Sequence, residues 1–270
     1  MSADFTAIVL GLIEGITEFL PVSSTGHLQL AERWLRPQSE LFDIVVQCGA
    51  VLAVLAVFHS RLRTLLHDIR LPVSRQYIGK SLLAFAVTVV GVLAAEKLGL
   101  KARKEDVEAA VWTARVAWAT LIGGVLFLLL ETWLRGRDAR NDVSWTVALA
   151  VGLAQILAAV YSGTSRSGAT ILIALALGVA RPAATEFSFL VGVPTLLAAG
   201  AYKFFKAWRH HELGGENWGA VLLATGVAAI TAFLVVRWLL RFVQTHTFVA
   251  FGWYRIALGL ILLLLPKSWL

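Results

Sequence analysis

The chain has 270 residues, of which 58% are hydrophobic and only 15% are charged, and its formal net charge is +7. Soluble globular domains are nearer about 45–50% apolar and 25% charged, so this composition excludes an ordinary soluble domain and predicts a polytopic membrane protein. The basic excess fits loops that face anionic lipid headgroups. No run of Lys and Arg is interleaved with aromatic residues, so we do not expect nucleic acid as a partner.

The first polar segment in apolar surroundings is Glu14–His27, which follows the apolar stretch Phe5–Ile13. A charged residue at mid-membrane costs about 2.5–3.5 kcal/mol on insertion scales, so Glu14 and Glu18 indicate a site that binds or reacts with something. Their spacing of four residues puts both carboxylates on one helix face. Two carboxylates so close repel unless a cation or a shared proton lies between them.

A proline and a polar turn follow the two glutamates. Pro21 ends the helix because it lacks a backbone N–H. The next residues, Ser23-Ser24-Thr25-Gly26, present hydroxyls and unpaired backbone N–H groups, which are the groups that bind phosphate and other anions. The alternative interpretation is a capped helix end followed by a polar loop at the membrane surface.

Apolar runs that predict membrane spans follow the first motif, at Leu41–Phe58, Leu82–Ala95 and Val116–Leu130. Between the first two lies His59–Lys80, which carries five basic residues against the single acid Asp68. Basic loops favour the cytoplasmic side, so we expect this segment to be a cytoplasmic loop.

The second half of the chain contains another interrupted apolar stretch. Val147–Val160 is apolar, Tyr161–Thr170 is polar, and Ile171–Ala180 is apolar again. Ten apolar residues are too few to span a bilayer, so we predict a broken, re-entrant hairpin. Three further spans are expected, at Phe187–Tyr202, Trp218–Val236 and Phe248–Leu265.

The two halves resemble each other. Ser23–Gly26 aligns with Ser165–Gly168, and Glu40–Phe42 aligns with Glu186–Ser188, at sequence offsets of 142 and 146 residues. Chance similarity between turns rich in Ser and Gly is the alternative. The repeated order of elements nevertheless favours an internal repeat, in which each half is one broken hairpin plus three spans.

Three spans is an odd number, so the second half must enter the membrane from the opposite side to the first. The predicted fold is therefore all-α, an inverted-topology repeat of three plus three transmembrane helices with two re-entrant helical hairpins that meet near the midplane. The expected repeats are residues 1–140 and 141–270, which together form one integral membrane domain.

The second motif supplies a fixed positive charge that the first one lacks. The guanidinium of Arg166 matches two phosphate oxygens with parallel hydrogen bonds and does not lose its proton. Hydroxyls surround it, from Ser162, Thr164, Ser165, Ser167 and Thr170. The alternative is an arginine that extends to a lipid headgroup from an interfacial loop.

The sequence resembles the undecaprenyl pyrophosphate phosphatases of the bacitracin-resistance type. The family's Glu/Gln-x-x-x-Glu motif appears as Glu14-Gly-Ile-Thr-Glu18, followed by Phe-Leu-Pro-Val-Ser-Ser-Thr-Gly-His. Its Pro-Gly-x-Ser-Arg-Ser-x-x-Thr motif matches Gly163 to Thr170, and Glu186–Leu190 is also similar. Ser162 departs from the pattern, because the family has proline there, and this puts the rigidity of the turn in doubt.

The resemblance implies an integral membrane phosphatase that hydrolyses a C55 polyprenyl pyrophosphate and so recycles the cell-wall lipid carrier. It also implies six spans, a site open to the periplasmic face of the bacterial inner membrane, and a divalent cation, Mg²⁺ or Ca²⁺. By position, Glu14 and Glu18 are the metal-binding or acid–base pair. Ser24 and His27 are candidates for nucleophile and base, and water is a third candidate nucleophile. The implied phosphate-binding residues are Ser23, Thr25, Ser165, Arg166, Ser167 and Thr170.

A secondary transporter or lipid flippase is the alternative function, since inverted repeats with broken hairpins are also an architecture of carriers. In that case Glu14, Glu18 and Arg166 would bind an ion and a phosphorylated anion without chemistry. Catalysis requires a base near a nucleophile, and His27 three residues after Ser24 favours the enzyme. The oligomeric state stays open, with a homodimer as one alternative.

Overall fold

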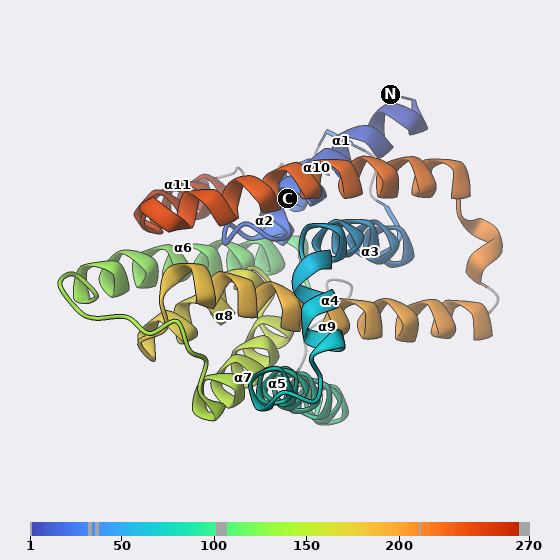
Figure 1. Cartoon of the computed structure of the whole chain (residues 1–270). Coiled ribbons are helices and arrows are strands. Elements are labelled where there is room, and N and C mark those ends of the chain that lie inside the picture. The colour runs from blue at the N-terminus through green and yellow to red at the C-terminus, as the bar shows by residue number, and fades with distance from the viewer. Residues whose placement is uncertain (1, 32–33, 36–37, 101–106, 211, 265–270) are drawn as a thin grey trace.

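The structure of the protein is a computed structural model that describes residues 2–31, 34–35, 38–100, 107–210 and 212–264. Helices form nearly all of the regular structure in these ranges (Figure 1). The first half contains α1 Ala3–Thr17, α2 Ser24–Ala31, α3 Glu40–Val57, α4 His59–His67, α5 Pro72–Lys97 and α6 Ala109–Trp133. The second half contains α7 Trp145–Val160, α8 Arg166–Ala176, α9 Arg181–Arg209, the 3₁₀ helix η2 Glu212–Gly215, α10 Trp218–Thr245 and α11 Val249–Leu264.

Within the described residues, four helices are long and apolar enough to cross a membrane, namely α5, α6, α9 and α10. A fifth crossing is formed if α3 and α4, which meet at a 65° bend, are counted as one. Helix α11 has 16 residues, which at about 1.5 Å each is shorter than a hydrocarbon core of about 30 Å. The sixth expected span therefore stays a prediction, and its last residue, Leu265, lies outside the described ranges.

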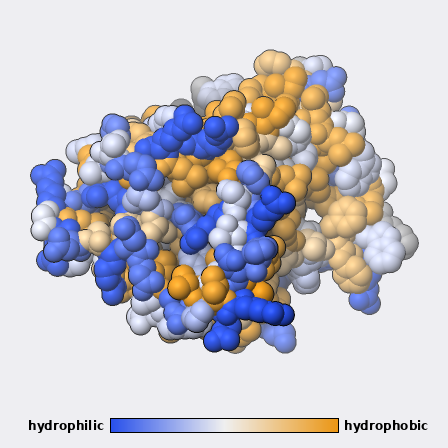
Figure 2. Space-filling model, in the orientation of Figure 1, coloured by the Kyte–Doolittle hydropathy of each residue, from blue (hydrophilic) through white to orange (hydrophobic). Residues whose placement is uncertain are grey.

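The surface agrees with this membrane assignment. Large apolar side chains are exposed along the long helices, among them Val90, Leu222 and Ile230. Such extended apolar surface on a folded chain indicates contact with lipid. Figure 2 shows hydrophobic residues over the right-hand part of the molecule and hydrophilic residues gathered over α4 and the left-hand end.

Two boundaries differ from the sequence-based expectation. The segment His59–Lys80, expected as a loop, contains α4 and the beginning of α5, so the span expected at Leu82–Ala95 begins ten residues earlier at Pro72. Proline at a first helical position is favourable because its missing N–H has no partner in that turn. The second hairpin also differs, because α8 begins at Arg166, where a polar loop was expected to continue to Thr170.

Glycines set the closest helix contacts. A Cβ at Gly11 would lie 2.5 Å from the Ala224 carbonyl oxygen, and one at Gly15 would lie 2.7 Å from that of Ala228. Because the residue numbers of the contacting positions increase in the same direction along both helices, α1 runs parallel to α10. Gly152 likewise meets Ala84, with 2.9 Å from such a Cβ to the carbonyl oxygen, where α7 packs on α5.

Each hairpin therefore packs its leading helix on a span from the other half of the chain. Helices α3 and α9 also pack together, as do α6 and α11. Exchange of the two predicted repeats would leave this set of helix pairs unchanged. The internal repeat and its two-fold relation stay predictions.

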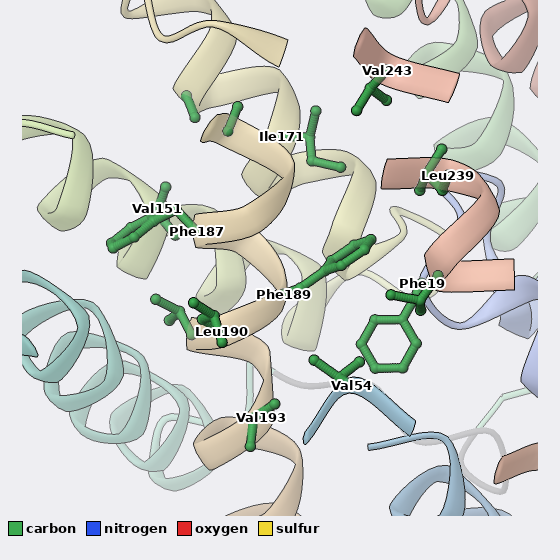
Figure 3. Packing of buried hydrophobic residues seen from close by; sticks show 14 of the residues in the cluster. Phe19, Val54, Val151, Ile171, Phe187, Phe189, Leu190, Val193, Leu239 and Val243 are labelled. Atoms are coloured by element: carbon green, nitrogen blue, oxygen red, sulfur yellow. The ribbon is translucent and has the colours of Figure 1, made fainter. Parts of the chain in front are cut away.

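The main core lies where the hairpin turns meet the central helices. Phe19, which follows α1, points toward Phe189 of α9, with their ring centroids 5.2 Å apart and nearly perpendicular. Figure 3 shows Val54 close to the same ring. Phe19, Phe189 and Val54 are all buried, so this apolar contact fixes the first hairpin against α9 and α3.

Candidate active site

The first hairpin turns back between Thr17 and Ser24. Glu14 lies in the last turn of α1, and Glu18 is the residue that ends this helix. Pro21 lies in the turn, as expected. Ser23 has a φ of 74°, a left-handed conformation that is rare for a non-glycine residue and often marks functional sites.

The second hairpin repeats this arrangement. Ser165 has a φ of 66° and precedes the first residue of α8. Its hydroxyl accepts a hydrogen bond from the Gly168 N–H at 3.2 Å and lies 3.2 Å from the hydroxyl of Ser167. Because Ser165 caps α8, the helix begins at Arg166 and projects this side chain from its first turn.

Hydrogen bonds between the two turns join the motifs. The Ser167 hydroxyl donates to the backbone carbonyl of Leu20 at 3.0 Å. Arg166 Nη2 donates to Glu18 Oε1 at 3.2 Å, and the two side chains are only 13% and 7% exposed. The two motifs, which lie about half the chain apart in sequence, therefore form one site.

Glu18 is the centre of this site. Its second oxygen, Oε2, accepts a hydrogen bond from the Ser24 hydroxyl at 3.0 Å. One carboxylate thus contacts both a hydroxyl and a guanidinium, and it lies where it can accept the serine proton. The sequence analysis offered His27 as a base for Ser24, and Glu18 as one of a metal-binding or acid–base pair; the structure places Glu18 beside the Ser24 hydroxyl.

His27 has other partners. Its Nδ1 lies 2.8 Å from the Ser23 carbonyl oxygen, and its Nε2 lies 2.6 Å from the Tyr254 hydroxyl, with the two rings nearly parallel. If Nδ1 carries the proton, it donates to Ser23 and leaves Nε2 as the acceptor from Tyr254. Sequence reasoning missed Tyr254; the available signal was a Tyr-Arg pair within an apolar run.

Glu14 is buried, and no hydrogen bond of normal geometry joins either of its oxygens to the described residues. Glu18, Asp43 and Gln47 nevertheless lie close enough to interact with it, and the Gln47 amide favours its charged form. A buried carboxylate beside two other acids is unfavourable without a cation or a proton. The site therefore fits a cation held by few protein ligands, which is how Mg²⁺ binds when phosphate oxygens and water supply the rest.

The described residues contain no group of three or more His, Cys, Asp or Glu side chains placed to hold a metal ion. Glu14 and Glu18 remain the residues that the sequence analysis offered for it.

Arg166 occupies a tight space. Its guanidinium carbon lies 5.6 Å from the centroid of the Phe19 ring. A Cβ at Gly192 of α9 would lie 1.7 Å from Nη1 of Arg166, so only glycine leaves room for this side chain. The Nε atom of Arg166 is buried and has no hydrogen-bond partner in the part of the chain that the structure describes. Gly192 was not singled out from the sequence, because nothing nearby in the chain indicates what lies against it.

The remaining predicted residues serve mainly the hairpin backbones. The Ser23 hydroxyl accepts from the Gly26 N–H at 3.4 Å, and Thr25 lies half-buried in the first turn of α2. Thr170 donates within α8 to the carbonyl of Arg166 at 2.8 Å and closely contacts the Ser188 hydroxyl. All ten candidate residues thus lie on the two hairpins, but Thr170 is fully engaged there.

The helices and this buried site define an integral membrane protein, and comparison with known proteins specifies the family. The model of the family described as "Bacitracin resistance protein BacA" matches residues 7–261, and the chain belongs to this family. A protein of Xylella fastidiosa (strain 9a5c) named "Undecaprenyl-diphosphatase" is 46% identical over 260 residues, which cover 96% of this chain and 97% of that one.

Other relatives carry the same name. The protein of Rhizobium johnstonii is 45% identical over 258 residues, covering 95% of each chain. That of Xanthomonas axonopodis pv. citri (strain 306) is 44% identical over 270 residues, covering 99% of each. The similarity therefore extends over both hairpins and is not confined to the motifs.

Proposed function

We propose that this chain is an integral membrane phosphatase that hydrolyses undecaprenyl pyrophosphate to undecaprenyl phosphate and inorganic phosphate. Family membership and the names of the relatives support this function. The structural observation that carries it is Glu18, which contacts the Ser24 hydroxyl and the Arg166 guanidinium at once. This arrangement joins a nucleophile, a proton acceptor and a phosphate-binding cation at one buried position.

The first step of the proposed mechanism is attack by Ser24. Its oxygen bonds to the terminal phosphorus, its proton moves to Glu18 Oε2, and the bond to the bridging oxygen breaks to release undecaprenyl phosphate. Water then cleaves the phosphoserine and releases inorganic phosphate. Direct attack by water, with Glu18 accepting its proton, uses the same residues.

Arg166 stabilises the charge that develops on the phosphoryl oxygens. In the structure its Nη2 is paired with Glu18, so the arriving pyrophosphate competes for the same guanidinium. When Glu18 accepts the serine proton it loses its negative charge, so its ion pair with Arg166 weakens and the guanidinium becomes available to the phosphate. Proton transfer and stabilisation of the transition state are coupled in this way.

A divalent cation, Mg²⁺ or Ca²⁺, fits beside Glu14 and Glu18. When bound, it would neutralise phosphate charge and polarise the phosphoryl group. Glu14 would be its main protein ligand, because both of its oxygens are buried and make no hydrogen bond of normal geometry to the described residues. Glu18 would contribute through the oxygen that it shares with Arg166 or Ser24.

The lipid part of the substrate has an apolar groove beside the site. A cavity of about 340 Å³ lies between the arms of the first hairpin, a volume within the range of small-ligand pockets. Its lining is apolar apart from His27, which connects it to the site; the lining residues are Phe5, Val9, Ile13, His27, Leu30, Ala31, Trp34 and Leu35. A C55 chain is far longer, so its remainder would lie in the bilayer.

We place the protein in the bacterial inner membrane, with the site open to the periplasmic face. The basic loop that contains α4 and the beginning of α5 then faces the cytoplasm. The packing directions of α1 and α10 support a topology with both termini on one side. Cysteine labelling from either face of spheroplasts tests this; labelling of the two termini from opposite faces would contradict it.

Phosphate release from undecaprenyl pyrophosphate by the purified protein in detergent tests the function, because no gradient exists there to drive transport. We expect turnover that depends on a divalent cation. Transport of the lipid in vesicles without any phosphate release would favour the carrier instead.

The same assay tests the metal site. Glu14→Gln keeps the size of the side chain but removes its charge, so the metal concentration for half-maximal activity should rise on the order of tenfold or more. An unchanged metal requirement in a folded Glu14→Gln variant would remove Glu14 from the cation site. Glu108→Gln, on an exposed loop, is the matched control.

A further inference from the structure

Arg255 of α11 is a second buried arginine, and it has a different environment from Arg166. Its side chain is fully buried, with an exposed fraction of 0%. Within the described part of the chain it makes no ion pair with an acidic side chain. Burial of an uncompensated charge is unfavourable, so its retention needs a reason beyond packing.

All of its hydrogen bonds go to backbone carbonyl oxygens. Nε donates to Thr120 at 3.1 Å, and Nη1 donates to Pro21 at 3.2 Å. Nη2 is within hydrogen-bond distance of three carbonyls, those of Ala119 at 3.2 Å, Gly163 at 3.4 Å and Thr164 at 3.0 Å.

These carbonyls belong to three different parts of the molecule. Pro21 lies in the turn of the first hairpin, Gly163 and Thr164 lie in the turn of the second, and Ala119 and Thr120 lie on α6. A carbonyl in a turn has no helical partner and must be satisfied otherwise when buried. One planar guanidinium thus holds both hairpin turns against α6.

The neighbouring glycines show how closely this group is enclosed. A Cβ at Gly123 of α6 would lie 2.2 Å from Arg255 Nη2. A Cβ at Gly168 would lie 3.2 Å from Nη1 and 3.1 Å from the Ser165 hydroxyl oxygen. The Arg255 charge therefore lies directly behind the Ser165 turn, from which Arg166 projects.

We propose that Arg255 is a positioning residue for the reaction: it fixes the separation of the two hairpin turns and adds uncompensated positive charge behind the pyrophosphate site. This inference rests on the proposed function. Catalysis requires Glu18 and Ser24 of one turn to meet Arg166 of the other, and a displacement of about 1 Å can reduce turnover on the order of 10²-fold. A polyanionic substrate would supply the negative charge that no acidic side chain of the described residues provides to Arg255.

Two substitutions separate the two roles. Arg255→Lys keeps the charge, but an ammonium group cannot reach carbonyls in all three parts. We expect its kcat to fall on the order of 10²-fold, with KM and the inhibition constant of inorganic pyrophosphate within about threefold of wild type. Arg255→Gln also removes the charge, so its inhibition constant for pyrophosphate should rise by about tenfold or more.

Control variants and a second route keep the test decisive. Arg241→Gln removes one exposed charge on α10 and should change neither constant. Gly123→Ala displaces the guanidinium without removing it and should reproduce the kcat loss of Arg255→Lys, even if the Arg255 variants fold poorly. Gly226→Ala, where a Cβ meets open space, is its control.

The readouts are kcat and KM normalised to the folded fraction, together with the shift in melting temperature that inorganic pyrophosphate produces. A merely structural Arg255 would lower the folded fraction alone; wild-type kcat per folded molecule in Arg255→Lys and Gly123→Ala would overturn the proposal. If the wild-type protein releases no phosphate, the proposed function fails. In that case, an equal pyrophosphate-induced shift in melting temperature for wild type and Arg255→Gln overturns the electrostatic role of Arg255 as well. A shift lost in Arg255→Gln supports that role independently.

Discussion

The two hairpins have similar backbones and carry opposite charges. Each begins its second helix after a serine with positive φ, Ser23 at 74° and Ser165 at 66°. The first hairpin brings Glu14 and Glu18, whereas the second brings Arg166. Because the turns contact each other, the opposite charges meet only in the folded protein.

The leading helices show the same contrast. Each has a long buried polar side chain, Glu14 in α1 and Gln155 in α7. The Gln155 amide nitrogen donates to the Thr88 hydroxyl at 2.9 Å, but its amide oxygen, like both oxygens of Glu14, makes no hydrogen bond to the described residues. The two positions therefore differ mainly in charge, because one half carries a carboxylate where the other carries a neutral amide.

The largest expected effect comes from the acidic hairpin. Glu18→Gln keeps the shape of the side chain but removes the proton acceptor of Ser24, so turnover should fall on the order of 10³-fold. Phosphate release by the folded variant measures this, with Glu108→Gln as the control. Near-normal turnover would exclude Glu18 as the base.

The basic hairpin should be almost as sensitive. Arg166→Lys keeps the charge but loses the planar two-point contact with phosphate, so kcat should fall on the order of 10²–10³-fold, with a smaller change in KM. The matched control is Arg241→Lys, which changes an exposed arginine on α10. If Arg166 only extended toward lipid headgroups, both variants would behave like wild type.

The space around Arg166 can be tested without changing its chemistry. In Gly192→Ala the new methyl group occupies the position of Arg166 Nη1, so the guanidinium must move. We expect a loss of activity of about 10- to 100-fold in a protein that still folds. Gly226→Ala adds the same methyl group in open space on α10 and should be silent. Equal activity of the two variants would contradict the arrangement.

The smallest expected effect concerns the serine with positive φ that precedes the second helix of each hairpin. Ser165→Gly removes the strain of a positive φ, and glycine is nearly as good a helix cap. The free energy of unfolding of this variant should therefore lie between that of wild type and a value about 1 kcal/mol higher. Ser165→Ala keeps the strain and loses the cap, and should be about 1 kcal/mol less stable. Thermal unfolding in detergent ranks the two, and a glycine variant below the alanine variant would refute the strain. The same order is expected at Ser23.

The sequence predicted the breaks and the motifs because charged and hydroxyl residues in apolar runs are a strong local signal. Both hairpins follow from it, as does the expectation that their motifs meet; the direct contact between Arg166 and Glu18 was not predicted. Helix α4 was missed because a basic segment between spans carries no apolar stripe long enough to distinguish a helix from a loop. Tyr254, Arg255 and Gly192 were missed for a different reason. Their roles depend on which distant turn lies against them, and nothing in the neighbouring sequence encodes that.

The packing of α1 on α10 has a consequence for how the chain is made. When the last residue of α1 has been added to the chain, the first residue of its partner α10 is still about 200 residues from being synthesised. At about 5–20 residues per second, this wait is on the order of ten to forty seconds. Helix α7, in contrast, meets a completed α5. The acidic hairpin must therefore pass this time without its main packing partner, with two carboxylates that favour water over lipid, and its packing can be completed only near the end of translation.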